Sequence, residues 1–142
     1  MPSWAGAVEA IKDTLTAEWT LTPVGFINEA PPVSDREPWI LLEVVTAARP
    51  TVYPGNPGDH AIIQSGLIYL HVLAPKGRGT DAAFTHAGNA GEIFRDRQLY
   101  AVDANHAVRS WTPVIEGGGR HSDDGNWFVV TCTIPFDYWH RG

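Results

Sequence analysis

Apolar positions at the start of the chain follow the period of a helix. Trp4, Val8, Ile11 and Leu15 recur at intervals of four, three and four residues, which places them on one helical face. Ser3 is a candidate N-cap, because its hydroxyl can accept a bond from a free amide of the first turn. The pattern predicts an amphipathic helix whose apolar face needs a sheet to cover.

The next apolar segments predict strands. Residues 21–28 predict a short strand interrupted by Pro23, which has no amide donor and therefore belongs at a sheet edge or bulge. Residues 39–46 are rich in β-branched and aromatic side chains and predict a second strand. Residues 47–59 contain Pro-Gly turn sequences, so this segment is predicted as the tip of a long hairpin with residues 61–73 as its return strand.

A second helix and three more strands are predicted in the rest of the chain. Thr80 is the candidate N-cap of the helix, and the pair Arg95 and Arg97 is expected in its last turn, where cations complement the helix dipole. Its narrow apolar face comprises Phe84, Ala87, Gly91 and Phe94. The strands are expected at residues 99–102, 108–115 and 127–138, and the last of them alternates strictly between apolar and other residues.

This order of elements predicts one α+β domain over residues 1–142, with a mainly antiparallel sheet, two helices packed on it and a long protruding β-hairpin. The composition agrees, because 44% of the residues are hydrophobic and 11% are aromatic, as in a globular protein. The 14 glycines and 11 prolines favour turns and short strands over a helical bundle.

Charge and composition narrow the class of function. The net charge is −6 and the ten basic residues are scattered, whereas a protein that grips phosphates needs clustered Lys and Arg. Sequence-independent DNA binding is therefore not expected, although an acidic passage would let DNA slide. No apolar run is long enough for a membrane span, and the N-terminus does not resemble a signal peptide, so the cytoplasm of the producing cell is expected. Cys132 is predicted to be a buried, inert thiol.

The sequence motifs do not indicate catalysis or a cofactor. The segment Lys76 to Thr80 lacks the spacing of a P-loop and is predicted to be a tight turn before a helix. The six histidines form no recognised metal-binding spacing, and Ser65-Gly66 lies inside a predicted strand instead of at a strand-to-helix elbow. Glu43 is expected on the polar face of its strand or in a subunit contact. We therefore predict no enzyme, no cofactor and no metal.

The aromatic content points towards assembly. Six tryptophans are many for a domain of this size, and aromatic side chains are enriched at protein contacts. Trp4 fits the core, whereas the tryptophans near strand ends are equally compatible with core and interface: Trp39, Trp111, Trp127 and Trp139.

The chain resembles the small tail terminator proteins of long-tailed bacteriophages and related gene transfer agents over residues 4–138. The resemblance depends on the order of its segments, beginning with the amphipathic first helix. Those that follow are residues 22–28 (Thr-Pro-Val-Gly-Phe-Ile-Asn), 38–40 (Pro-Trp-Ile), the long hairpin, 65–72 (Ser-Gly-Leu-Ile-Tyr-Leu-His-Val), 75–79 (Pro-Lys-Gly-Arg-Gly) with its helix, 124–127 (Asp-Gly-Asn-Trp) and 134–138 (Ile-Pro-Phe-Asp-Tyr).

The resemblance implies a homohexameric ring that binds the last ring of tail-tube protein, ends tube growth and offers a face to the head-side connector or stopper protein. DNA would only pass through the lumen, and no membrane is involved. The protein would then belong to the tail or neck of the virion, or to a gene transfer agent, and would be assembled in the cytoplasm of the host bacterium.

The family shares no catalytic motif, so the contact residues are predicted from the chain itself. They are Tyr53, Asn56 and His60 at the hairpin tip, and Arg120, Asp123 and Asp124 in the glycine-rich loop of residues 117–125. Three alternatives stay open. One is a neck or connector-completion protein, which shares the architecture but binds the head side. Another is a small metal-binding or enzymatic β domain that uses some of the histidines. The third is a toxin-neutralising or regulatory protein, which would bind one different chain instead of copies of itself.

Overall fold

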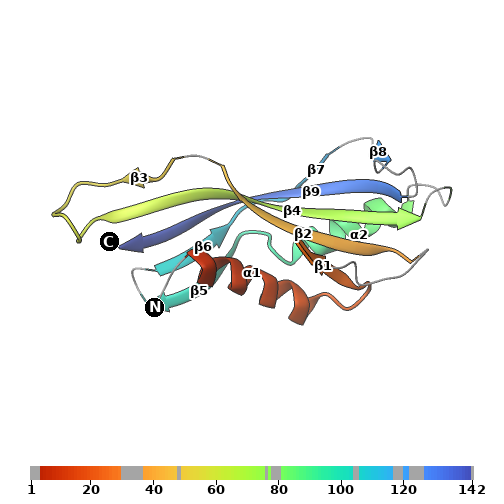
Figure 1. Ribbon diagram of the computed structural model, residues 1–142, viewed down its shortest axis with the longest axis horizontal. Helices are drawn as coiled ribbons and strands as arrows, with labels where there is room; N and C mark the ends of the chain where they lie inside the picture. The colour runs from red at the N-terminus through yellow and green to blue at the C-terminus, as the bar shows by residue number, and fades with distance from the viewer. Residues whose placement is uncertain are drawn as a thin grey trace.

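The computed structural model describes residues 4–29, 37–47, 49–75, 77, 81–103, 106–116, 120–121 and 127–141. These residues form two helices and nine strands (Figure 1), which confirms the predicted α+β class with a mostly antiparallel sheet. The elements are α1 (Trp4–Glu18), β1 (Val24–Phe26), β2 (Trp39–Thr46), β3 (Thr51–Val52), β4 (Ala61–Pro75), α2 (Asp81–Glu92), β5 (Arg97–Asp103), β6 (His106–Ser110), β7 (Val114–Ile115), β8 (Arg120–His121) and β9 (Trp127–Arg141).

The strands form a single sheet in the order β1-β2-β4-β9-β6-β5. β1 pairs in parallel with β2, and the other pairs are antiparallel. The short strands lie beside the long ones, since β3 pairs with β4, and β7 and β8 pair with β9. The predicted edge position of the strand near Pro23 is confirmed, although this strand is shorter than predicted and begins after the proline.

β4 and β9 dominate the sheet. Each contains 15 residues, and they pair over their whole length, from Ala61 opposite Arg141 to Pro75 opposite Trp127. At about 3.3 Å per residue such a ribbon is roughly 50 Å long. It runs along the long axis of the molecule in Figure 1.

Residues 49–60 lie between the end of β2 and the start of β4, and they are called the arm below. β3 pairs with the first residues of β4, and the amide of Tyr53 donates to the carbonyl of Ala61 at 2.9 Å. A further bridge joins Asn56 to Asp59. Figure 1 places β3 at one end of the long axis, with the chain beyond it turning back into β4.

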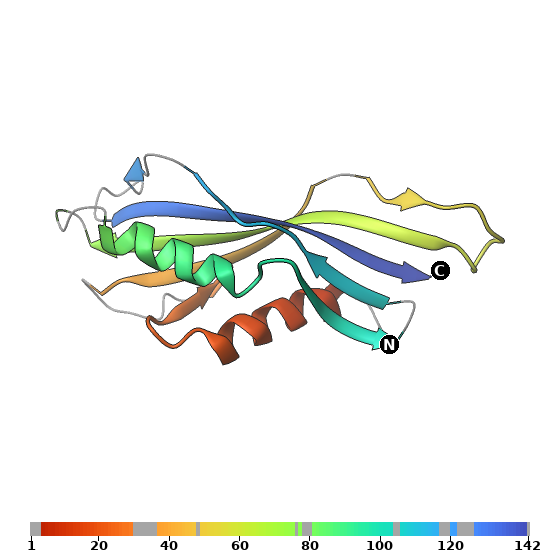
Figure 2. The ribbon, with the colours of Figure 1, turned by 180° about the vertical axis from the view of Figure 1, so that it is seen from behind.

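Both helices lie on the same face of the sheet (Figures 1 and 2). In α1 the fully buried residues are Ala7, Ile11 and Leu15, while Trp4 is partly buried and stacks on Phe136 at 5.8 Å between ring centroids. The even-numbered residues from Ile68 to Ala74 and from Val130 to Tyr138 complete the core beneath the helices. The predicted apolar face of the first helix is therefore confirmed in position.

Two sequence predictions about the second half are wrong. The strand predicted at residues 108–115 is divided into β6 and β7, because Pro113 lies between them and cannot donate to a ladder. α2 ends at Glu92, so Arg95 and Arg97 do not lie in its last turn. Arg95 instead follows the helix and bonds Glu92, while Arg97 begins β5. The predicted N-cap, Thr80, lies outside the described residues.

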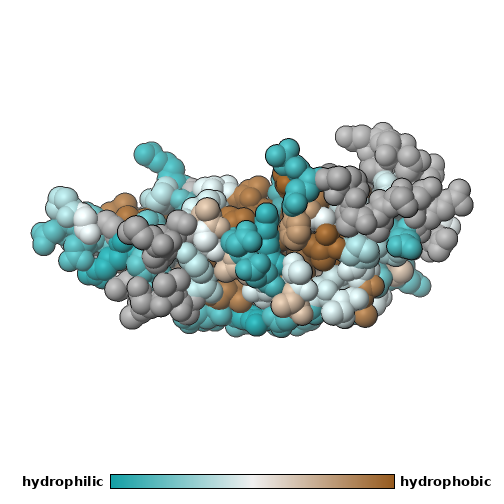
Figure 3. All heavy atoms as spheres, turned by 60° about the horizontal axis from the view of Figure 1, so that its bottom comes forward, coloured by the Kyte–Doolittle hydropathy of each residue, from teal (hydrophilic) through white to brown (hydrophobic). Residues whose placement is uncertain are grey.

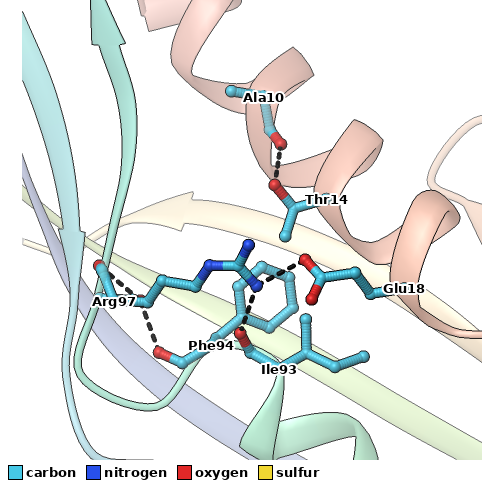
Figure 4. A network of polar contacts seen from close by, with 7 residues as sticks. Ala10, Thr14, Glu18, Ile93, Phe94 and Arg97 are labelled. Carbon is cyan, nitrogen blue, oxygen red and sulfur yellow. Dashed lines mark hydrogen bonds and ion pairs between the residues drawn. The ribbon is translucent and has the colours of Figure 1, made fainter.

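Arg97 joins the ends of both helices (Figure 4). Its guanidinium donates to the carboxylate of Glu18, the last residue of α1, and to the carbonyl of Ile93, just after α2, at 3.2 Å. The hydroxyl of Ser110, fully buried in β6, also approaches two carbonyls of this turn, those of Phe94 and Arg97. These bonds satisfy backbone groups that the helix end leaves free and fix where α2 passes into β5.

Two glycines of α2 offer a matched test of how closely this helix packs on the sheet. A Cβ at Gly91 would lie 2.8 Å from Sγ of Cys132 and 3.1 Å from Cβ of Pro113, whereas a Cβ at Gly88 would meet only Ile115, at 3.7 Å. We expect Gly91→Ala to lower the free energy of unfolding by about 1–3 kcal/mol through overpacking. Gly88→Ala should raise it by about 0.5–1 kcal/mol through helix propensity. Urea denaturation of both variants checks this, and equal effects would contradict the close packing at Gly91.

Candidate interaction surface

The pairing of β4 with β9 divides their side chains between two faces. Ile68 lies opposite Ile134 on the face that the helices cover, while Tyr69 lies opposite Thr133 on the other face. The register continues into β2, where Glu43 lies opposite Tyr69, and into β6, where Arg109 lies opposite Asp137. We call the side away from the helices, formed by the odd-numbered residues of these strands, the outer face.

The outer face is largely apolar although neither helix covers it. An antiparallel sheet with one face in water normally alternates apolar inward and polar outward residues. Here Trp39 and Val129 are both buried, Trp139 is 50% exposed, and most of the others are half-buried. The apolar members are Trp39, Leu41, Val45, Ile63, Leu67, Tyr69, Leu73, Val129, Pro135 and Trp139. This composition matches a sheet that is packed on both sides.

Exposed apolar side chains also occur at the margins of the sheet. Trp111 follows β6 and is 41% exposed, and Val114 of β7 is 57% exposed beside Thr133 of β9. Leu21 and Ile27 are exposed on either side of β1. Figure 3 views the molecule from the α1 side, where apolar residues occur in several small groups between hydrophilic ones.

Three polar side chains form a bridge across the middle of the outer face. Nε2 of His71 lies 2.9 Å from Oε1 of Glu43, and its Nδ1 lies 2.9 Å from Oγ1 of Thr131. The three residues come from adjacent strands, β2, β4 and β9. The ring of Tyr69 stacks on the imidazole at 5.6 Å between centroids. Glu43 points away from the core, but the face on which it lies is largely apolar, unlike the polar face that the sequence predicted for it.

The bridge can stabilise the pairing of β2, β4 and β9. Glu43, His71 and Thr131 are bonded in the order acid, imidazole and hydroxyl, which is also the order in a hydrolytic catalytic triad. His71 and Thr131, however, lie directly opposite each other inside the β4–β9 ladder, where the backbone amides pair with the neighbouring strand. The side-chain bonds therefore add to the ladder and hold β2, β4 and β9 in register. Among the residues that the structure describes, no three His, Cys, Asp or Glu side chains gather as a metal site would require.

Asp137 forms a second polar group nearer the arm. Its two carboxylate oxygens accept from the hydroxyl of Ser65 at 2.8 Å and from the indole of Trp111 at 3.1 Å. The guanidinium of Arg109 lies over the Trp111 ring, 4.6 Å from its centroid. This group orients Trp111 so that an exposed aromatic ring stands at the margin of the outer face, in contact with a cation.

The arm brings together three of the predicted contact residues. Tyr53 is 45% exposed, its carbonyl lies 3.2 Å from Nδ1 of His60, and Asn56 pairs with Asp59 in the same turn. Arg120 is elsewhere, because β8 pairs with Val129, at the opposite end of β9. The other two predicted contact residues, Asp123 and Asp124, lie outside the described residues, as does most of the predicted loop of residues 117–125.

A hollow of about 490 Å³ lies where the arm joins the sheet. It is lined by Tyr53, Ala61, Ile62, Ile63, Trp139, His140 and Arg141. Beside it Nε of Arg141 donates to Oδ1 of Asp59 at 2.6 Å, and this bond lowers the pKa of the Asp59 carboxyl. The sequence analysis did not identify Trp139 and Arg141 as part of this region. The strict alternation of the last strand, continued past Tyr138, would have placed both on the outer face.

The cysteine prediction is confirmed, since Cys132 is a free, fully buried thiol. Burial raises its pKa to about 11. The thiolate is therefore scarce at neutral pH, which agrees with a packing role for this side chain. No helix in the described part of the chain is long and apolar enough to cross a membrane.

The comparisons with known proteins give information about the fold and none about the function. No protein-family model matches the chain, and no curated protein matches it. Solved structures do match, and one of them, whose name describes no activity, has a TM-score of 0.65 and 20% sequence identity. The match covers 94% of this chain and 91% of the other. At this identity the likeness shows that the whole α+β architecture occurs in another solved protein.

Two neighbouring threonines test the polar bridge. Thr131→Val would leave Nδ1 of His71 without its partner in a largely buried site, so we expect the free energy of unfolding to fall by about 1–3 kcal/mol. Thr133→Val, on the same face of the same strand, loses only a 3.4 Å contact with Glu116 and should change stability by less than about 0.5 kcal/mol. Thermal or urea denaturation measures both. If the two variants are equally stable, the bridge contributes nothing to the sheet.

Proposed function

We propose that this chain is a structural protein of a tailed phage or a gene transfer agent. In this proposal copies of the chain assemble into a ring. The resemblance to tail terminators implies that the ring is a homohexamer. The ring ends the tail tube and joins it to the head-side connector.

The observation that carries the proposal is the apolar outer face. Leaving it in water is unfavourable by about 25 cal/mol for each Å² of apolar surface, and assembled proteins bury such faces in subunit contacts. Exposed aromatic side chains at its margin, Trp111 and Trp139, add the residue type that contributes most to protein contacts.

The order of elements supports the same proposal. Among the described residues, the segments on which the resemblance depends lie on or next to α1, β1, β2, β4, α2 and β9. The arm adds a second surface, with Val52 and Tyr53 exposed. A net charge of −6 suits a ring through which DNA passes without binding.

Native mass spectrometry of the untagged protein is the first test. We expect a metal-free hexamer, either in solution or after addition of tail tubes, because ring contacts must offset the entropy lost on association. A monomer that carries one tightly bound metal ion would contradict the proposal and favour a histidine site. To separate the terminator from a neck protein, tails purified from head-defective particles can be probed, because only a terminator should be present on them.

Deletion of residues 51–58 tests the role of the arm. These residues are exposed, so the shortened chain should keep its fold, measured by circular dichroism and its unfolding midpoint. Ring formation should be lost, measured by native mass spectrometry. A shortened protein that still forms rings and caps tails would contradict a role for the arm in assembly.

A further inference from the structure

The arm carries exposed apolar and basic side chains. Val52 is 56% exposed and Tyr53 is 45% exposed, so both offer apolar surface to a partner. Arg49, at the base of the arm, is also exposed and takes part in no ion pair with another described residue. The arm therefore combines an apolar surface with an available positive charge.

Around β7 the outer face carries exposed apolar side chains and a carboxylate, which are complementary to the apolar and basic side chains of the arm. Trp111 and Val114 are exposed there. Glu116 is exposed as well, and its carboxylate accepts from the Thr133 hydroxyl at 3.4 Å. Glu43 lies three strands from β7 and is about one-third exposed, with its Oε1 bonded to His71. This surface is apolar and carries carboxylates, together with one cation, Arg109, that lies over the Trp111 ring.

The two surfaces of one copy cannot meet each other. Val52 and Tyr53 lie at the level of Ile62 and Ala61, whereas Val114 lies at the level of Thr133 and Tyr69, seven to eight residues or roughly 23–26 Å further along the strands. Arg49 lies nearer, between the levels of Ser65 and Ile63, but on the β2 and β3 side of β4, so that β4 and β9 separate it from β7. The partner of each surface must therefore belong to another molecule.

Building on the proposed ring, we infer that the arm of one copy packs on the outer face of the next. Val52 and Tyr53 cover Trp111 and Val114, and Arg49 approaches Glu116. An arm-to-face contact is heterologous, using different surfaces on the two copies, and this type of contact closes into a ring when the rotation allows.

Disulfide trapping tests this contact directly. A chain with Tyr53→Cys and Val114→Cys, oxidised after assembly, should yield a ladder of covalent dimers, trimers and larger species on a non-reducing gel. The buried Cys132 does not compete. The matched control carries Tyr53→Cys and Leu21→Cys, because Leu21 is equally accessible but lies beside β1; it should yield no ladder. Each single variant should stay monomeric on the same gel.

The outcomes separate this contact from the ring itself. A hexamer that gives no ladder, or gives one only with Leu21→Cys, overturns the arm-to-face contact and leaves the ring. Efficient dimers from the Val114→Cys variant alone would indicate face-to-face stacking and also overturn it. A native chain that forms neither a ring nor a ladder, even with tail tubes present, overturns both.

A charge exchange provides an independent measurement. Arg49→Glu should weaken association by about fivefold for each contact, because an exposed attraction becomes a repulsion. Adding Glu116→Arg to the same chain should restore assembly, since each contact then pairs the two reversed charges. Failure of the double variant to recover, with its fold intact by circular dichroism, would contradict the pairing of Arg49 with Glu116.

Discussion

The structure depends on the full-length antiparallel pairing of β4 with β9. Since side chains alternate along a strand, this one register assigns every residue of both strands to the core or to the outer face. A slip by one residue would expose Ile68, Ile134 and their neighbours and would bury Tyr69 and Thr133 in their place. The neighbouring strands, both helices and the polar bridge at His71 all take their positions from this pair.

The helices cover only one of the two faces that the pairing creates. α1 and α2 pack on the even-numbered residues, with Arg97 and Ser110 holding the ends of the helices against the sheet. Gly66 shows how tightly this side is filled, because a Cβ there would lie 2.6 Å from the ring of Phe136 and 2.7 Å from the carbonyl of Val45. Neither helix of the described residues forms such a layer on the outer face, where polar contacts join β2, β4 and β9. The proposed assembly rests on this asymmetry.

The sequence predicted most helices and strands well, because the hydrophobic periodicity that indicates them depends on residues close together in the chain. The helical spacing from Trp4 to Leu15 and the strict alternation in the last strand each depend on residues close in sequence. Errors occurred where a neighbour in space decided the outcome. Arg97 appeared to belong to a helix end, but its bonds to Glu18 and Ile93 place it at the turn into β5. Tyr53, Asn56 and His60 lie together in the arm because they are close in sequence, and their role as contact residues stays a prediction. Arg120, which was predicted in a loop, joins a strand pair that no local motif reveals.

By itself, the sequence determined the α+β class, the buried cysteine and the turn-rich arm, since hydrophobic periodicity and proline-glycine turns act within a few residues. The tertiary structure alone decided which strands are neighbours, and so it created the Glu43–His71–Thr131 bridge and the group around Asp137 from residues far apart in the chain. It also decided that neither α1 nor α2 covers the apolar outer face. Alternation identifies two faces of a strand, but which of them a helix covers depends on how the whole chain packs.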